Sequence, residues 1–273
     1  MGYGRKKKTE DNMTNKHKKG VPEIVLKVIK EADILLEILD ARFVNETRNK
    51  EIESEIIKRR KKLVFILNKV DLVNIDELYK KIELDALKPY VLFSCSERKG
   101  LKDLRILLKI EAKKINFPQI RVGVIGYPNT GKSSIINLLM GKHVARTSQQ
   151  AGFTKGMQKL KLSSNIMLLD TPGLIPPAED SHLNMGVVAK HAQIGIDTWD
   201  KIRDPDLAVY NMMNLYPKIF QRFYNIKEDA NVNDIIEKVG REKNLLKKGG
   251  EVDIDRASRI ILKDFQEGKI KVL

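Results

Sequence analysis

The stretch "GYPNTGKSS" at residues 126–134 decides how the chain folds, because glycines there join a strand pattern to a helix pattern. The apolar run "IRVGVIG" (120–126) precedes it, and the amphipathic run "SSIINLLMG" (133–141) follows it. In this context GxxxxGK[ST] indicates a phosphate-binding loop, whose glycines let backbone N–H groups curl inward beside a helix N-terminus. The stretch therefore predicts an α/β domain with an anion-binding loop at the carboxyl end of a parallel strand.

Several residues of this loop have an expected role toward a nucleotide. Lys132 is expected to reach the β- and γ-phosphate oxygens, and the hydroxyl of Ser133 is expected to ligate Mg²⁺. The predicted nucleotide-binding residues of the loop are Asn129, Thr130, Gly131, Lys132, Ser133 and Ser134.

The stretch "LLDTPG" (168–173) is the expected partner of the phosphate loop. Its strand ends at Asp170, whose carboxylate can hold Mg²⁺ through water, and the amide of Gly173 is placed to sense the γ-phosphate. Between the two motifs lies "QQAGFTKG" (149–156), in which Thr154 is the expected second Mg²⁺ ligand.

A second loop predicts recognition of the base. "FILNKVDLVN" (65–74) ends a strand at the residues "NKVD", which are Asn68, Lys69, Val70 and Asp71. A carboxylate facing the base accepts hydrogen bonds from guanine N1–H and N2–H₂, and adenine offers neither. Such a site rejects the wrong base by roughly 10⁴-fold or more, because the carboxylate would be left unpaired.

Two further features complete the expected base site. The aliphatic stem of Lys69 is suited to lie along the base. The next strand ends in "SCS", and the backbone amides of Ser94, Cys95 and Ser96 are expected to approach the guanine oxygen.

Apolar, β-branched runs alternate with amphipathic helical patterns along the first part of the chain, which predicts a doubly wound, mostly parallel six-stranded sheet. The last two runs, 157–163 and 165–170, are close enough to pair as a hairpin. The predicted strands are 32–41, 61–69, 90–96, 120–126, 157–163 and 165–170, and the helices between them are 22–32, 49–60, 101–114 and 133–141.

From about residue 180 only helical periods occur, for example 231–246 and 253–265, with Asn and Asp at the expected N-cap positions. We therefore predict a basic arm (1–20), a nucleotide-binding domain (21–178) and a small all-helical domain (179–273).

The order of the motifs is unusual, because in small GTPases the phosphate loop precedes NKxD. In a doubly wound sheet, however, ligand-binding loops meet at the carboxyl ends of the strands whichever strand comes first. Circular permutation therefore preserves the site. Its consequence is that the Asp170–Gly173 loop leads directly into the helical domain.

The charge and composition of the chain limit the classes of partner that the protein is expected to bind. The net charge of +15, with seven Lys/Arg against two acids in residues 1–20, predicts binding to RNA. "KRRKK" (58–62) is explained equally well as the cationic end of a helix. No apolar run is long enough to span a membrane, and no signal peptide is evident, so we expect a cytoplasmic protein. We also expect a monomer. The lone Cys95 and four histidines argue against internal disulfides and a zinc site.

The motif order NKVD, SCS, GYPNTGKS, DTPG resembles that of the circularly permuted GTPases, and in particular the YlqF/RbgA-like ribosome-assembly GTPases. "LDARF" (39–43) with "TRN" (47–49) is similar to the family's DARxP…RN signature, although the proline is absent. "DRASRIILKDFQEGKI" (255–270) resembles the end of the family's C-terminal helical domain. The resemblance implies binding of GTP and GDP, slow hydrolysis stimulated by ribosomal particles, assembly of the large ribosomal subunit or its precursor, and contact with rRNA.

Hydrolysis raises a specific question, because Leu174 occupies the position of the glutamine that orients water in Ras-type enzymes. The resemblance points instead to a histidine in the N-terminal segment, which by spacing is His17; the alternative is that His17 contacts RNA. Asn129 is also expected to hold a K⁺ ion near the phosphates.

Two other functions stay open at this point. Because Leu174 cannot hold water, the chain could be a GTP-gated RNA-binding scaffold with negligible hydrolysis. It could also be a permuted GTPase that acts on another structured RNA. A membrane-acting version is disfavoured by the absence of an amphipathic anchor.

Overall fold

The computed structural model describes residues 21–115, 117–141, 157–173, 175–176, 179 and 185–272. Predictions on the basic arm with His17, on Thr154 and on Leu174 therefore lie outside the described residues. Within the described residues, six strands form one sheet in the order β3-β2-β1-β4-β6-β5. Their bounds are β1 Ile34–Asp40, β2 Lys62–Asn68, β3 Tyr90–Leu92, β4 Ile120–Ile125, β5 Gln158–Lys161 and β6 Ile166–Asp170.

Five of these strands run parallel. β1 pairs with both β2 and β4, β2 pairs with β3, and β4 pairs with β6, all in the same direction. Only β5 runs antiparallel, against β6, which confirms the predicted hairpin. The parallel strands therefore present their carboxyl ends at a common edge, and the predicted fold class is confirmed.

Helices cover both faces of the sheet. Val28 of α1 (Glu23–Glu31) and Ile52 of α3 (Lys50–Lys58) pack on one face, in a buried cluster with Leu35. Leu104 of α5 (Leu101–Ile115) and Ile135 of α6 (Lys132–Met140) pack on the other face. Short elements lie in the connections: α2 Val44–Thr47, η1 Val70–Leu72, α4 Ile75–Lys81 and η2 Leu84–Leu87.

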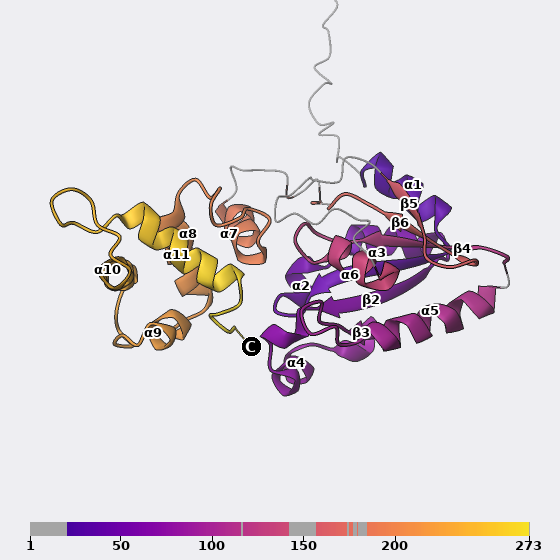
Figure 1. Ribbon diagram of the computed structural model, residues 1–273, viewed down its shortest axis with the longest axis horizontal. Coiled ribbons are helices and arrows are strands. Elements are labelled where there is room, and N and C mark those ends of the chain that lie inside the picture. The colour runs from indigo at the N-terminus through magenta and orange to yellow at the C-terminus, as the bar shows by residue number, and fades with distance from the viewer. Residues whose placement is uncertain are drawn as a thin grey trace, which may run out of the picture.

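Every helix described after β6 belongs to a second group, which Figure 1 shows gathered beside the sheet with the C-terminal end next to α4. These are α7 Met185–Ile194, α8 Pro205–Leu215, α9 Ile219–Phe223, α10 Val232–Glu242 and α11 Ile254–Gln266. Asn231 and Asp253 cap α10 and α11 with their side chains, as the sequence predicted.

The core of the helical group is not formed by its own helices alone, because two side chains from the nucleotide-binding domain are buried in it. Phe43, from the loop after β1, and Tyr127, from the phosphate loop, are buried in the same cluster as Phe220 and Phe265. The Phe43 and Phe265 rings stack with centroids 6.0 Å apart. None of the described helices is long and apolar enough to cross a membrane.

Two predicted elements are too long. The helix predicted over 231–246 ends at Glu242, and a strand was also predicted too long. The strand predicted over 90–96 ends at Leu92, and Ser94 pairs with Lys99 in an isolated bridge. The chain turns back here because Gly100, at φ +79°, packs against the carbonyl of Leu92, where an added Cβ would lie 2.2 Å from the oxygen. The residues predicted at the strand end thus lie in a tight loop just beyond it.

Candidate functional site

The phosphate loop lies between β4 and α6 and depends on two glycines. Gly126 has φ +143°, and a Cβ there would lie 2.5 Å from the carbonyl oxygen of Ile38. Gly131 has φ +103°, and a Cβ there would lie 2.2 Å from the Asn68 amide nitrogen. Only glycine combines these backbone angles with so close an approach, so the loop can curl tightly against β1 and β2.

Lys132 begins α6 and is buried. Its ammonium donates to the carbonyl of Tyr127, 2.5 Å away, and the Thr130 hydroxyl donates to the same oxygen. Burial lowers the pKa of Lys132 to about 8, although the charge of nearby Asp170 acts in the opposite direction. A buried ammonium held over a loop of backbone amides favours an anionic ligand, which would compensate its charge.

Asp170 ends β6 and faces Lys132. Its side chain is buried, and burial raises its pKa to about 6. Among the described residues its Oδ1 atom has no hydrogen-bond partner. A buried carboxylate oxygen without a partner carries a desolvation cost that a divalent cation would offset, so this residue fits Mg²⁺.

The loop that follows Asp170 packs on the phosphate loop. The Thr171 hydroxyl donates to the carbonyl of Val124, and a Cβ on Gly173 would lie 2.8 Å from the Cα of Pro128. The predicted γ-phosphate sensor, Gly173, is therefore in contact with the phosphate loop itself.

Asn129 is oriented by the helical group. It adopts φ +60°, and its amide nitrogen donates to the carbonyl of Gly195, just after α7. Ser133 and Ser134 occupy the first turn of α6 and are partly buried. The predicted phosphate-loop residues are thus all brought to the carboxyl edge of the sheet.

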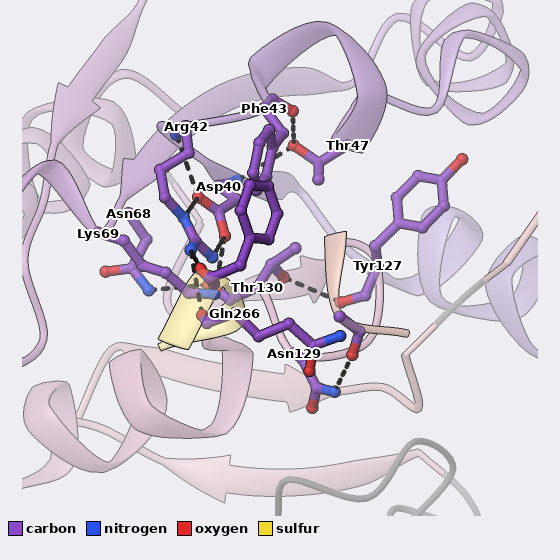
Figure 2. Close-up of polar contacts among 12 residues, drawn as sticks. Asp40, Arg42, Phe43, Thr47, Asn68, Lys69, Tyr127, Asn129, Thr130 and Gln266 are labelled. Carbon is purple, nitrogen blue, oxygen red and sulfur yellow. Dashed lines mark hydrogen bonds and ion pairs between the residues drawn. The ribbon is translucent and has the colours of Figure 1, made fainter. Parts of the chain in front are cut away.

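The base-reading loop contacts the phosphate loop directly. The Asn68 side chain is buried, and its amide nitrogen donates to the Thr130 carbonyl at 2.8 Å (Figure 2). Loops that are reversed in sequence order therefore meet in space, as the permuted arrangement predicted.

Asp71 is held by the loop after β3. The Ser96 hydroxyl donates to the Asp71 carboxylate at 2.8 Å, and the hydroxyls of Ser94 and Ser96 lie 3.0 Å apart. Partial burial alone would raise the pKa of Asp71, but hydrogen bonds from these serines lower it. Asp71 is therefore kept ionised and accepting, as recognition of guanine requires.

Val70 and Cys95 also belong to these two loops. The Val70 amide donates to the carbonyl of Phe93, which fixes the base-reading loop to the end of β3. Burial raises the pKa of the Cys95 thiol to about 11, so this cysteine stays protonated at neutral pH.

The sequence singled out Asp40 and Arg42 only as part of the LDARF signature and did not predict the charged group that they form beside this loop. Asp40 ends β1 directly opposite Asn68 and accepts from Lys69 at 2.7 Å. Arg42 donates to both Asp40 oxygens, at 3.0 and 2.8 Å (Figure 2). The signal was available, because Asp40 stands at a parallel strand end just as Asn68 and Asp170 do.

A second missed group links the phosphate loop to α7. The Tyr127 hydroxyl donates to Glu179 at 3.0 Å, and the Lys190 ammonium donates to the same carboxylate at 2.7 Å. Lys190 also lies 5.0 Å from the centroid of the Tyr127 ring. Tyr127 had no role in the sequence analysis, because an x position of GxxxxGK[ST] carries no expected chemistry.

Comparison with known sequences bears on what this site does. The family model described as "50S ribosome-binding GTPase" matches residues 121–246. The chain is 37% identical over 251 residues to an uncharacterized GTP-binding protein of Methanocaldococcus jannaschii, covering 92% of this chain and 66% of that protein. It is 34% identical over 256 residues to nucleolar GTP-binding protein 2 of Saccharomyces cerevisiae, covering 89% of this chain and 51% of that protein. The chain thus spans about half to two thirds of the length of these curated relatives.

Solved structures with the same architecture carry nucleotides. The GNP-bound structure of YlqF from T. maritima superimposes with a TM-score of 0.64 at 27% identity, covering 90% of this chain and 92% of that one. The GDP-bound YlqF structure gives a TM-score of 0.65 at 27% identity, covering 90% and 94% of the two chains. Because the match covers 90% of this chain, the likeness extends through both the sheet and the helical group. The chain belongs to the YlqF-like family of circularly permuted GTPases.

Proposed function

We propose that this protein binds GTP and GDP, hydrolyses GTP, and acts in assembly of the large ribosomal subunit through nucleotide-controlled binding to rRNA. The observation that carries the nucleotide part is the contact of Asn68 with Thr130, which makes one site of the base-reading and phosphate loops. In this proposal residues 21–178 form the GTPase domain, 179–273 the helical RNA-binding domain, and 1–20 a basic arm.

Selection of guanine rests on Asp71. Its carboxylate is kept ionised by the serine hydroxyls of the neighbouring loop, and it accepts from the N1 and N2 groups of the base. Asn68 joins this loop to the phosphate loop, while Val70, Ser94, Cys95 and Ser96 shape the surrounding wall.

The phosphates bind to the backbone amides of the loop and to Lys132. Lys132 exchanges the Tyr127 carbonyl for the β- and γ-oxygens, whose charge compensates the buried ammonium. Ser133, Asp170 through water, and Thr154 would hold Mg²⁺, which neutralises charge on the β- and γ-phosphates. Asn129 is the candidate K⁺ ligand, with its amide already oriented by Gly195.

Hydrolysis requires a group that orients water, and Leu174 has no hydrogen-bonding side chain. We assign this role to His17. If no group orients water, the protein is a GTP-gated RNA-binding scaffold, which is the second candidate function.

The ribosomal partner is supported by charge and by the names of relatives. The chain carries a net charge of +15, which favours a polyanion. The matching family is described as ribosome-binding, and several eukaryotic relatives are named nucleolar GTP-binding proteins. A permuted GTPase acting on another structured RNA is the alternative partner class.

Two measurements test the proposal. Titration with fluorescent GDP, competed by unlabelled GDP and ADP, should show displacement by GDP alone; equal competition by ADP would contradict guanine selection. Turnover of GTP is then measured with and without large ribosomal subunits, for the unaltered protein and for His17→Ala. Stimulated turnover that His17→Ala abolishes, with GDP affinity retained, supports the enzyme. Negligible turnover in both conditions favours the scaffold.

A further inference from the structure

Arg42 lies between the base-reading loop and the helical group. Its guanidinium donates to both oxygens of Asp40, and Asp40 in turn accepts from Lys69 of the NKVD motif. Burial alone would raise the pKa of Asp40, but the charges of Arg42 and Lys69 hold it well below its ordinary value. The three side chains therefore form one ionised cluster that fixes where Lys69 lies.

The same guanidinium binds the end of the last helix. Arg42 Nη1 donates to the carbonyl oxygens of Phe265 and Gln266, at 3.3 and 3.1 Å. Carbonyls in the last turn of a helix have no partner within the helix and carry the negative end of its dipole. Arg42 is thus shared between the guanine side of the site and the end of α11.

A second contact joins the same two regions independently. Gly268, in the turn after α11, has φ +79° and packs on Leu72, where a Cβ would lie 2.6 Å from Leu72 Cδ1. Leu72 follows Asp71 directly and closes η1. The turn after α11 therefore presses against the short helix that carries the guanine-reading carboxylate.

We propose that Arg42 is a positioning residue for guanine recognition, and that Arg42 and Gly268 together make the docked end of α11 part of the wall that orders the base-reading loop. The proposal rests on the guanine-nucleotide binding proposed above. Because the α11 end orders the loop, loosening it weakens guanine binding, and guanine binding in turn stabilises docking of α11.

The test perturbs the α11 side without altering any residue of the nucleotide site. Gly268→Leu inserts a side chain against Leu72, and leucine is chosen because the flexible Leu72 side chain could yield to a single methyl group. Gly250→Leu is the matched control: Gly250 has a similar φ of +85°, but nothing lies within 4 Å of a Cβ there. Both variants place a leucine at a similar positive φ, and we expect only the first to displace the base-reading loop.

The expected result is a GDP dissociation constant about five- to tenfold higher for Gly268→Leu than for Gly250→Leu, at the lower end of typical coupling between sites. Equal dissociation constants for these two folded variants would overturn the proposal. If the unaltered protein did not bind GDP at all, the proposed function itself would fail, which is a distinguishable outcome.

A second variant tests Arg42 directly. Arg42→Lys keeps a positive charge beside Asp40, but an ammonium lacks the planar fork that spans Asp40 and the two carbonyls. Binding is measured for GDP and for inosine diphosphate, which lacks the 2-amino group that Asp71 reads. Misplacement of the loop should reduce the preference for GDP over inosine diphosphate by about fivefold. An unchanged preference, with both ligands weakened equally, would show only a structural role and would overturn the assignment of Arg42.

Discussion

Replacing Asn68 with alanine tests whether one hydrogen bond unites the nucleotide site. Asn68 is buried, and its amide nitrogen donates to the Thr130 carbonyl at 2.8 Å. Removing one partner of a buried hydrogen bond costs about 1–3 kcal/mol. Because the bond joins the base-reading loop to the phosphate loop, we expect this cost to appear in binding as an affinity about 5- to 150-fold lower for GDP.

The control is an asparagine that caps a helix in the helical group. Asn231 caps α10 by accepting from the amides of Asn233 and Asp234. Asn231→Ala should lower the free energy of unfolding by about 1 kcal/mol and leave GDP affinity unchanged. Fluorescent-GDP titration and urea unfolding of the nucleotide-free protein are measured for both variants. An unchanged GDP dissociation constant in Asn68→Ala would refute the claim that the two loops form one site.

Three further outcomes are expected. Asp170→Asn should stabilise the nucleotide-free protein at pH 8 by up to about 3 kcal/mol, because the pKa of Asp170 is raised to about 6 and folding disfavours its ionised form. Urea unfolding should show that this gain in the free energy of unfolding shrinks as the pH falls through 6. The variant should also lose Mg²⁺-dependent nucleotide binding. Phe43→Ala removes a buried ring stacked on Phe265 and should cost about 3–5 kcal/mol in urea unfolding. GTP turnover should be faster in KCl than in NaCl if Asn129 holds K⁺, and equal rates would exclude that role.

The sheet and its ligand edge could be predicted from the sequence because both follow from local patterns. Buried parallel strands appear as continuous apolar runs, and the residue that ends each run lies at one edge whatever the order of the strands. That rule brought Asn68 and Asp170 to the site. Applied once more, it would have brought Asp40 there, since its run ends in the same way.

The link from the site to α11 could not be predicted in this way. Arg42 binds main-chain carbonyls of Phe265 and Gln266, and every residue has a carbonyl, so the sequence of α11 carries no signature of the contact. Likewise, Gly268 looks like any glycine after a helix, and its approach to Leu72 depends on how distant elements are oriented. β3 was predicted to extend beyond Leu92, because the hydrogen-bonded turn that follows does not interrupt the apolar pattern of the sequence.

The permuted chain order gives the helical group two attachments to the nucleotide site. On the phosphate side it is joined covalently, because the loop with Gly173 leads toward α7, and Lys190 of α7 shares Glu179 with Tyr127. On the base side it is joined by Arg42 at the end of α11. The Gln266 side chain connects these attachments, since its amide donates to the carbonyls of Ala192 in α7 and Asp197 just after it. A rearrangement of the phosphate loop or of the base-reading loop would therefore act on the same two helices, α7 and α11. In an unpermuted chain the base-reading loop would come later in the sequence, and the γ-phosphate loop would not lead directly into these helices.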